Sequence, residues 1–347
     1  MSEQILEPEL PIIDAHHHLW DWPKEFLGSL QPADHGFTDI IRNIPRYLFE
    51  QLMADLVSGH NIRATVYMEC GAMYRADGPD ALKCVGETEF VNGVAAMSAS
   101  GLYGETRACA GIVGHVDLRI GAGVEDVLRS HIGAGHGRFR GIRHAAAYDE
   151  DPNVLGPLSG RNAAGLYLNP KFREGFKVLH RLGLSFDAWL LEPQLPDVID
   201  LARAFPETTI VLDHVGTPLG IGRYKGKREE RFATWSDSIN ALSKSPNVYV
   251  KLGGLPMPFG GWRARMDGPD EPSGTLAAQW KPYIEACIAA FGPERCMFES
   301  NFPVDRFGAT YTALWNAFKR ITKDYSAEEK TALYSGTAKR VYRLAVS

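Results

Sequence analysis

The chain has 347 residues, of which 45% are hydrophobic and 23% charged, as in an ordinary globular protein. Its formal net charge of -5 and its pI near 6.1 argue against a nucleic-acid-binding surface. No run approaches the roughly 20 apolar residues of a membrane span, and the first residues lack the basic start of a secretion signal. Five cysteines are scattered without a CxxC pair, which predicts reduced core thiols. We therefore expect a cytoplasmic protein without nucleic-acid or membrane partners.

The first strand-like run, 11–20, ends in three histidines and then a Trp-Asp-Trp-Pro turn. Side chains alternate along a strand, so Asp14, His16 and His18 are expected on one face and His17 on the other. Two imidazoles converging at the C-terminal end of a strand are typical of a metal site or an acid/base site. Because the cluster lies inside an apolar strand pattern, a remnant of an affinity tag is a poor explanation.

Further strand-like and helix-like runs alternate along the chain. The strand-like runs are 63–70, 109–116, 139–144, 184–189, 209–216, 248–252 and 296–300. Apolar residues near helical spacing predict helices at 46–60, 93–101, 124–131, 171–182, 194–205, 232–243, 276–291, 310–321 and 326–342.

Eight strands separated by helices predict an α/β fold, a single (β/α)8 TIM-barrel domain over residues 1–347. The long loops follow strands, which places them at the C-terminal face of the barrel. An open doubly wound sheet is the alternative, but no glycine-rich dinucleotide motif follows the first strand. The aromatic-rich segment 20–37 is expected to be exposed, and either to pack on a second subunit of a homo-oligomer or to close the mouth.

Charged and polar side chains gather where the predicted strands end. They are His16, His18, Glu69, Arg143, His144, His214, Lys251, Glu299 and Asn301, with Asp305 in the loop beyond. Because the strand ends of a barrel meet at one face, this convergence favours an active site. Single residues also have structural interpretations: Glu69 or Lys251 could pair within the barrel, and His115 or His144 could be core histidines bonded to backbone.

Three motifs together resemble those of a known superfamily. They are Asp14-x-His16-x-His18-x-Trp20, Leu212-Asp213-His214-Val215-Gly216 and Glu299-Ser300-Asn301-Phe302-Pro303. The chain resembles the amidohydrolase superfamily, and within it the amidohydrolase-related branch that includes sugar lactonases and pyrone dicarboxylate lactonase. The resemblance runs along essentially the whole chain and implies a TIM-barrel hydrolase.

The resemblance also implies where a metal would bind. Metal-dependent members use two strand-one histidines, a strand-four Lys or Glu, histidines of strands five and six, and a strand-eight aspartate. His16, His18 and His214 match these positions. The run 184–189 contains no histidine, and Arg143 stands near the strand-four position.

The strand-eight aspartate is replaced by Asn301. A carboxylate balances a divalent cation and accepts a proton from the attacking water, whereas an amide does neither. Some members of the lactonase branch work without a required metal. The expectation is therefore that no cofactor is required, or that His16, His18 and His214 hold a single divalent metal such as zinc.

Catalytic roles are predicted for His16, His18, His214, Asn301 and Asp305. The histidines would donate to a carbonyl or relay a proton, and Asn301 would hold a donor or a water. Asp305 is the candidate base, unless it is a solvated loop residue or a helix cap. Glu299 is the other candidate base, or else a structural partner of Lys251 or Arg143.

Arg143 is a fixed cation with planar donors, which suits a substrate carboxylate or a developing oxyanion. The other predicted substrate-binding residues are Glu69, Tyr74, Arg75, His144, Trp189 and Trp262. These cations and aromatic faces suit an anionic, ring-shaped small molecule. We therefore expect a hydrolase that opens a small carboxylated lactone by water attack. Two alternatives are a metal-dependent decarboxylase of the same barrel family and a non-catalytic metabolite-binding relative.

Overall fold

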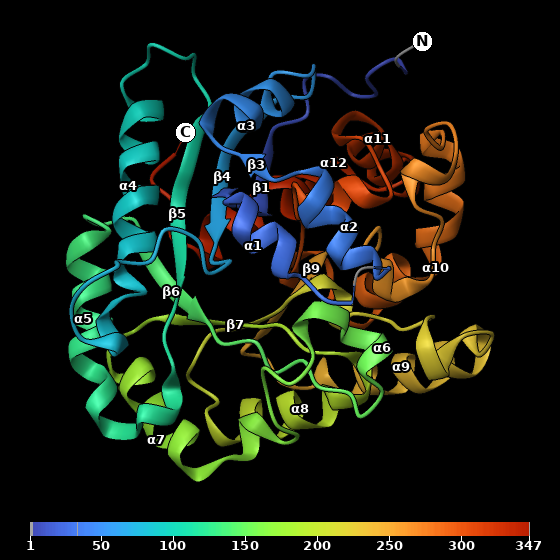
Figure 1. Ribbon diagram of the computed structural model, residues 1–347. Coiled ribbons are helices and arrows are strands. Elements are labelled where there is room, and N and C mark those ends of the chain that lie inside the picture. Colours follow the sequence, from blue (N-terminus) through green and yellow to red (C-terminus); the bar gives the residue numbers. More distant parts are fainter. Residues whose placement is uncertain (1–2, 33, 347) are drawn as a thin grey trace.

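The computed structural model describes residues 3–32 and 34–346. Its main sheet has eight parallel strands paired in the order β1-β4-β5-β6-β7-β8-β9-β10, at the centre of Figure 1. The strands are β1 (Ile12–His17), β4 (Ile62–Met68), β5 (Arg107–His115), β6 (Phe139–Arg143), β7 (Ser185–Ala188), β8 (Ile210–Leu212), β9 (Val248–Leu252) and β10 (Cys296–Phe298). Each lies within or across a predicted strand, so the predicted TIM barrel is confirmed.

Two backbone hydrogen bonds close the sheet just past the end of β10. Asn301 N donates to His16 O at 2.8 Å, and His18 N donates to Phe302 O at 2.7 Å. His17 and Phe302 form an isolated parallel bridge at the same place. Closure gives every strand two neighbours, and it brings the histidines of β1 beside Asn301.

Helices surround the barrel (Figure 1). Those of the outer ring are α3 (Phe49–Leu56), α4 (Val85–Ala99), α5 (Glu125–Ala134), α7 (Pro170–Arg181), α8 (Leu195–Ala204), α9 (Arg228–Leu242), α10 (Ser273–Phe291), α11 (Tyr311–Ile321), α12 (Ala327–Thr331) and α13 (Thr337–Val341). The largest apolar cluster packs them on the strands, with Phe172, Trp235 and Leu314 among its most buried members.

A separate apolar cluster joins alternate strand residues to the end of the chain. Val66, Val113 and Met297 pack there with Tyr342, which follows α13. The Tyr342 hydroxyl donates to Asp187 Oδ1 of β7 at 2.6 Å. The C-terminal segment therefore supports the strand residues that lie directly below the site.

The aromatic-rich segment after β1 differs from its expectation as an exposed stretch. It forms α1 (Lys24–Ser29) and α2 (Gly36–Asn43), the blue helices near the middle of Figure 1. Trp20 at its start is only 4% exposed. Thr38, Ile40 and Ile41 of α2 are buried, whereas α1 has no buried residue, so the segment packs on the protein through Trp20 and α2 while α1 stays at the surface.

Three predicted helices have other boundaries. Within 46–60, β3 (Arg46–Tyr47) pairs with β2 (Trp20–Asp21), so the helix begins only at Phe49. The helix predicted at 93–101 begins already at Val85. The one predicted at 326–342 is interrupted by a wider π-helical turn, Ala332–Gly336.

The expected side-chain alternation along β1 fails at one residue. Asp14 accepts hydrogen bonds from Ser300 N at 2.8 Å and from the Tyr311 hydroxyl at 3.1 Å, toward helix α11. The register between β1 and β4 shifts between Asp14 and His17, as at a β-bulge. The bulge changes the face that Asp14 presents, whereas His16 and His18 stay together as predicted.

No helix among residues 3–32 and 34–346 is long and apolar enough to cross a membrane. We propose that the chain forms one domain, because strands from residue 12 to residue 298 share a single sheet.

We expect the buried His131 to make stability depend on pH. The ring is fully buried, stacks on Phe139, and lies with Nδ1 2.8 Å from the Thr88 hydroxyl. Burial lowers the pKa of His131 to about 4. In the unfolded chain His131 binds a proton near pH 6.5, whereas in the folded protein it does so only near pH 4. The contribution of His131 to stability therefore falls as the pH decreases from 6.5 to 4, and it does not change below pH 4.

The measurement is the free energy of unfolding in urea, for the unchanged protein and for His131→Asn, from pH 7 to pH 4. The unchanged protein should lose roughly 3 kcal/mol relative to the variant across this interval. A difference between the two proteins that does not change with pH would contradict the expectation.

Candidate active site

A cavity of about 430 Å³ lies at the C-terminal end of the barrel strands, where TIM-barrel enzymes carry their active sites. Of the predicted site residues, those that line it are His18, Glu69, Tyr74, Arg143, His144, Trp189, His214 and Asn301. Trp20, Trp22, Phe26 and Phe37 of the mouth segment also line it. Polar groups from the strand ends and aromatic rings from the loops thus share one cavity.

His16 and His18 meet as predicted, with their Nε2 atoms 3.2 Å apart. His18 Nδ1 lies 2.9 Å from the Met68 carbonyl oxygen, so Nδ1 carries a proton and donates it. Burial lowers the pKa of both rings well below the usual value, and both are therefore uncharged at neutral pH. His18 reaches the cavity, whereas His16 lies behind it.

His214 forms a hydrogen-bonded pair with Glu299. His214 Nδ1 donates to Glu299 Oε1 at 2.7 Å, and His214 N donates to the same oxygen at 3.2 Å. Glu299 Oε2 lies 2.9 Å from His16 Nδ1. Because the Nδ1 proton of His214 points at the carboxylate, Nε2 of the neutral ring keeps its lone pair.

Lys251 lies at the centre of a fully buried ion network. Its ammonium donates to Asp187 Oδ1 at 2.7 Å, and lies 3.0 Å from Asp213 Oδ1 and 3.2 Å from His16 Nδ1. Burial disfavours the ammonium, but Asp187 and Asp213 outweigh it and hold the pKa of Lys251 above its usual value. The structural interpretation of Lys251, pairing within the barrel, is therefore the one observed.

Arg143 is held from two sides at the end of β6. Its Nε donates to Glu69 Oε1 at 2.7 Å, and its Nη2 donates to the Glu69 carbonyl oxygen at 2.6 Å. Its Nη1 lies 3.5 Å from Asp213 Oδ2 and 3.5 Å from His16 Nε2. Burial is again outweighed, here by Glu69 and Asp213, which raise the pKa of Arg143. The guanidinium is a permanent, fixed cation in the cavity wall.

Asp305 does not reach the cavity, which corrects its prediction as the base. It is fully buried, and its Oδ1 accepts a hydrogen bond from Asn301 Nδ2 at 2.7 Å. Burial raises the pKa of Asp305 well above its usual value, although the bond from Asn301 opposes this. Asp305 therefore orients the Asn301 amide, whose Oδ1 lies 3.3 Å from His18 Nε2.

The backbone around His214 is strained. His214 and Val215 have φ of 56° and 48°, and Asn301 has φ of 53°. A β-branched residue such as Val215 rarely adopts this left-handed conformation, and such strain is common at functional sites. Gly254 packs against the turn, where an added Cβ would lie 2.4 Å from His214 Cβ. Only glycine leaves room for the imidazole at this position.

Two predicted substrate-binding residues, Arg75 and Trp262, do not line the cavity. Arg75 donates through Nε to Glu89 of α4 at 3.0 Å. The ring of Trp262 packs under the Arg228 guanidinium, whose Cζ lies 3.5 Å from the ring centroid. Each side chain instead contacts a residue of a helix, Arg75 through Glu89 of α4 and Trp262 through Arg228 of α9.

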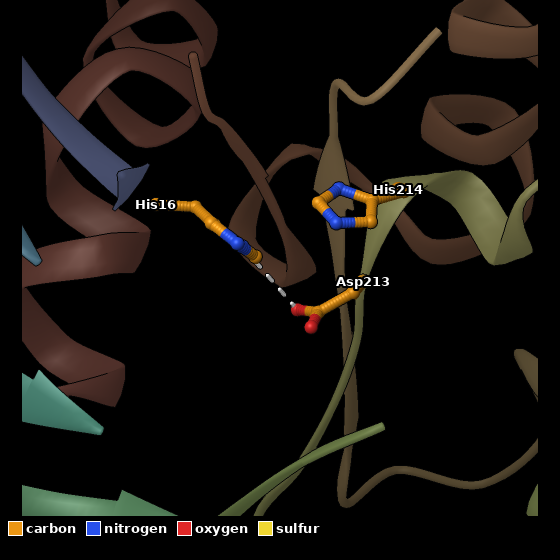
Figure 2. A group of neighbouring side chains, drawn as sticks. All are labelled: His16, Asp213 and His214. Atoms are coloured by element: carbon orange, nitrogen blue, oxygen red, sulfur yellow. Dashed lines mark ion pairs between the residues drawn. The ribbon is translucent and has the colours of Figure 1, made fainter. Parts of the chain in front are cut away.

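One group of side chains has the donors that a metal ion needs. It consists of His16, Asp213 and His214, whose ligand atoms lie within 4.8 Å of one another (Figure 2). Two imidazoles and a carboxylate suit zinc in donor type. His18, the third metal ligand predicted from the sequence, is not part of this group, although its Nε2 lies 3.2 Å from His16 Nε2.

The carboxylate of this group is already paired within the protein. Both oxygens of Asp213 already face a cation, Lys251 Nζ at 3.0 Å and Arg143 Nη1 at 3.5 Å. A metal ion bound at this group would therefore compete with Lys251 and Arg143 for the Asp213 carboxylate.

Two residues of the buried ion network have no predicted catalytic role: Asp213 appears only within a motif, and Lys251 is expected at most as a structural ion pair. Glu299 is predicted as an alternative base or a structural partner. The position of Asp213 and Lys251 inside apolar strand-like runs is the signal that could have identified them, because charged residues are buried only when they are paired. The cavity arginines lie in a short 3-10 helix (Arg119) and in a loop (Arg161), and neither segment carries a periodic signal.

Comparison with known proteins agrees with this geometry. Residues 13–344 match the protein-family model described as amidohydrolase. An uncharacterised protein of Sinorhizobium fredii, y4mH, is 33% identical over 97% of this chain and 99% of its own length. An L-fucono-1,5-lactonase of Burkholderia multivorans is 27% identical over 79% of this chain and 88% of its own length.

A crystal structure of a zinc-bound amidohydrolase from Burkholderia multivorans is similar over 96% of this chain and 99% of that one, with a TM-score of 0.71 and 25% identity. The chain belongs to the amidohydrolase family of hydrolases, as its motifs predict.

Removing the central cation should destabilise the fold. In Lys251→Met, Asp187 and Asp213 lose their shared partner, and we expect the free energy of unfolding at pH 7 to fall by about 3–5 kcal/mol. The loss should be smaller at pH 5, because burial already raises the pKa of Asp187 to about 6 and protonation removes the uncompensated charge.

Denaturant titration at both pH values measures this effect. Lys281→Met is the control, since Lys281 is half exposed and lies 3.4 Å from Glu285, and its loss should cost less than about 0.5 kcal/mol. Equal effects of the two substitutions would show that the buried network does not stabilise the protein.

Proposed function

We propose that this protein is a metal-independent lactone hydrolase, which opens a small cyclic ester by attack of water. The observation that carries the proposal is the His214–Glu299 hydrogen bond of 2.7 Å. His214 lines the same cavity as the fixed cation of Arg143. The relatives named L-fucono-1,5-lactonase support a lactone as the substrate class.

Arg143 would stabilise the oxygen of the ester carbonyl. Negative charge develops on that oxygen when water adds, and a preoriented cation stabilises it most strongly where water is excluded. Glu69 and Asp213 hold the guanidinium in place, so little reorganisation accompanies the reaction. The Nε2 face of His18 and the Asn301 amide line the same cavity and would position the ester and the water.

His214 would act as the general base. Its Nε2 takes a proton from water, while Glu299 stabilises the imidazolium through Nδ1. The new hydroxide oxygen bonds to the carbonyl carbon, and the bond from this carbon to the ring oxygen then breaks. His214 returns the proton to the ring oxygen, so one lactone and one water give one hydroxy acid. The pair thereby replaces the strand-eight carboxylate that Asn301 lacks.

The cavity suits a small ring in size and lining. Its volume of about 430 Å³ is at the lower end of the range for small-molecule sites. Trp20, Trp22, Phe26 and Trp189 offer flat apolar faces to a ring. We also propose that the enzyme acts in the cytoplasm, because its five cysteines are free thiols.

Chelation separates this proposal from a metal-dependent reaction. We expect purified protein treated with a strong chelator to hydrolyse members of a panel of five- and six-membered lactones at an unchanged rate, since Lys251 and Arg143 already supply the positive charge. Hydroxy-acid release and metal content are measured on the same sample. Near-stoichiometric zinc together with loss of turnover on its removal would contradict metal independence and would show that lactone hydrolysis depends on a metal.

The His214–Glu299 pair should behave as one catalytic unit. We expect His214→Asn and Glu299→Gln each to lower kcat by roughly 10²- to 10⁴-fold, and the double variant to be no slower than the slower single variant. His180→Gln, which changes a histidine of α7 that lies 2.9 Å from the Thr208 hydroxyl, is the control and should keep full activity. Fully additive losses in the double variant would mean that the two residues act independently.

A further inference from the structure

The charged residues that line the cavity are mostly cationic. Arg119, Arg143 and Arg161 face it, against the single carboxylate of Glu69 among its lining residues in the described chain. An apolar cavity with an excess of positive charge concentrates anions. The three arginines differ, however, in whether the protein already neutralises them.

Two of the arginines are paired. Arg143 contacts Glu69 and Asp213, as described above. Arg119 donates to both oxygens of Asp117, through Nε at 2.8 Å and Nη2 at 2.9 Å. A bidentate pair of this kind uses the planar donor face of the guanidinium. Neither side chain has its full donor set available for a ligand.

Arg161 has neither an ion pair nor a hydrogen bond with any residue of 3–32 and 34–346. The surrounding protein lowers the pKa of Arg161 by desolvation, and Glu69 opposes this only through its charge at a distance. Arg161 is an exposed residue that lines the cavity, so its unpaired guanidinium is accessible to an added anion. Its five N–H donors match the two oxygens of a carboxylate.

The loop that carries Arg161 is shaped to present it. The side chain follows Gly160, and Gly160 and Gly165 adopt left-handed φ of 76° and 69°. The neighbouring Asn162 also lines the cavity and adds an amide donor. This segment lies between α6 (Pro152–Leu155) and α7, in the loop that follows β6 and Arg143.

We propose that Arg161 binds a carboxylate group of the substrate, so that the preferred lactone carries a carboxylate outside the ring ester. This inference rests on the proposed lactone hydrolysis and adds its substrate class. In this assignment Arg161 binds the substrate carboxylate, and Arg143 stabilises the oxygen of the ester carbonyl. Different arginines of the same cavity therefore serve recognition and cleavage.

The test compares two lactones that differ only in charge: γ-butyrolactone bearing a γ-carboxylate, and the same ring bearing a γ-carboxamide. We expect Arg161→Gln to raise KM for the carboxylate roughly 10- to 100-fold, with kcat changed less than about twofold, as for loss of a charge-assisted hydrogen bond. KM for the carboxamide should stay within about twofold. Arg161→Lys should restore part of the loss, because it keeps the charge without the planar donors.

Arg223→Gln is the matched control, because Arg223 is an arginine of another mouth loop that pairs with Asp149 at 3.1 Å. It should leave both KM values unchanged. An equal rise of KM for both lactones in Arg161→Gln, or no rise for either, would overturn the role of Arg161. Unchanged carboxamide kinetics also show that the variant is folded.

Calorimetric binding of the ring-opened γ-carboxylated hydroxy acid and of its carboxamide analogue distinguishes failure of this inference from failure of the proposed function. If neither lactone is hydrolysed, lactone hydrolysis is refuted for these rings. Selective binding of the carboxylate that is lost in Arg161→Gln would still support the anion site. Equal binding of both compounds would refute it.

Discussion

The Lys251 ammonium is the interaction on which the site depends. It lies fully buried between Asp187 and Asp213 and within 3.2 Å of His16 Nδ1. An ammonium without partners would not stay charged at this depth, and neither would the carboxylates. The barrel brings them together because β7, β8 and β9 are neighbours in the sheet. Closure of the sheet between β1 and β10 also places β1 beside Asn301. The balance of charges in the site therefore follows from the order of the strands.

Asn301, just past the end of β10, cannot accept a proton from water, so another residue must do so. The amide is held by Asp305, a carboxyl group that lies buried behind it and whose pKa burial raises well above its usual value. The acid that can assist proton transfer lies two residues earlier, where Glu299 contacts both His214 and His16. A carboxylate-supported imidazole is a common solution to base catalysis at neutral pH. The site therefore combines the imidazoles of His16, His18 and His214 with carboxylates that are paired with Lys251 and Arg143.

The mouth of the barrel separates recognition from chemistry. Rigid strand ends carry Arg143 and His214, whereas the loops supply the aromatic walls and Arg161. Strand ends are fixed by the sheet and hold the geometry that a reaction needs, and loops tolerate change and set specificity. The segment after β1 folds over the cavity instead of extending outward, since Trp20 and its aromatic neighbours bury more apolar area there.

The amino-acid sequence by itself determined the eight strands, the order of helices between them, and the meeting of His16 and His18, because hydrophobic periodicity and side-chain alternation are local properties. It could not determine pairings between residues far apart in the chain. That His214 pairs with Glu299, that Lys251 neutralises Asp213, and that Asp305 lies behind Asn301 depend on strand register and loop packing. The same holds for the free guanidinium of Arg161: only the tertiary structure decided which cations have partners, because electrostatic pairing depends on distance in space and not along the sequence.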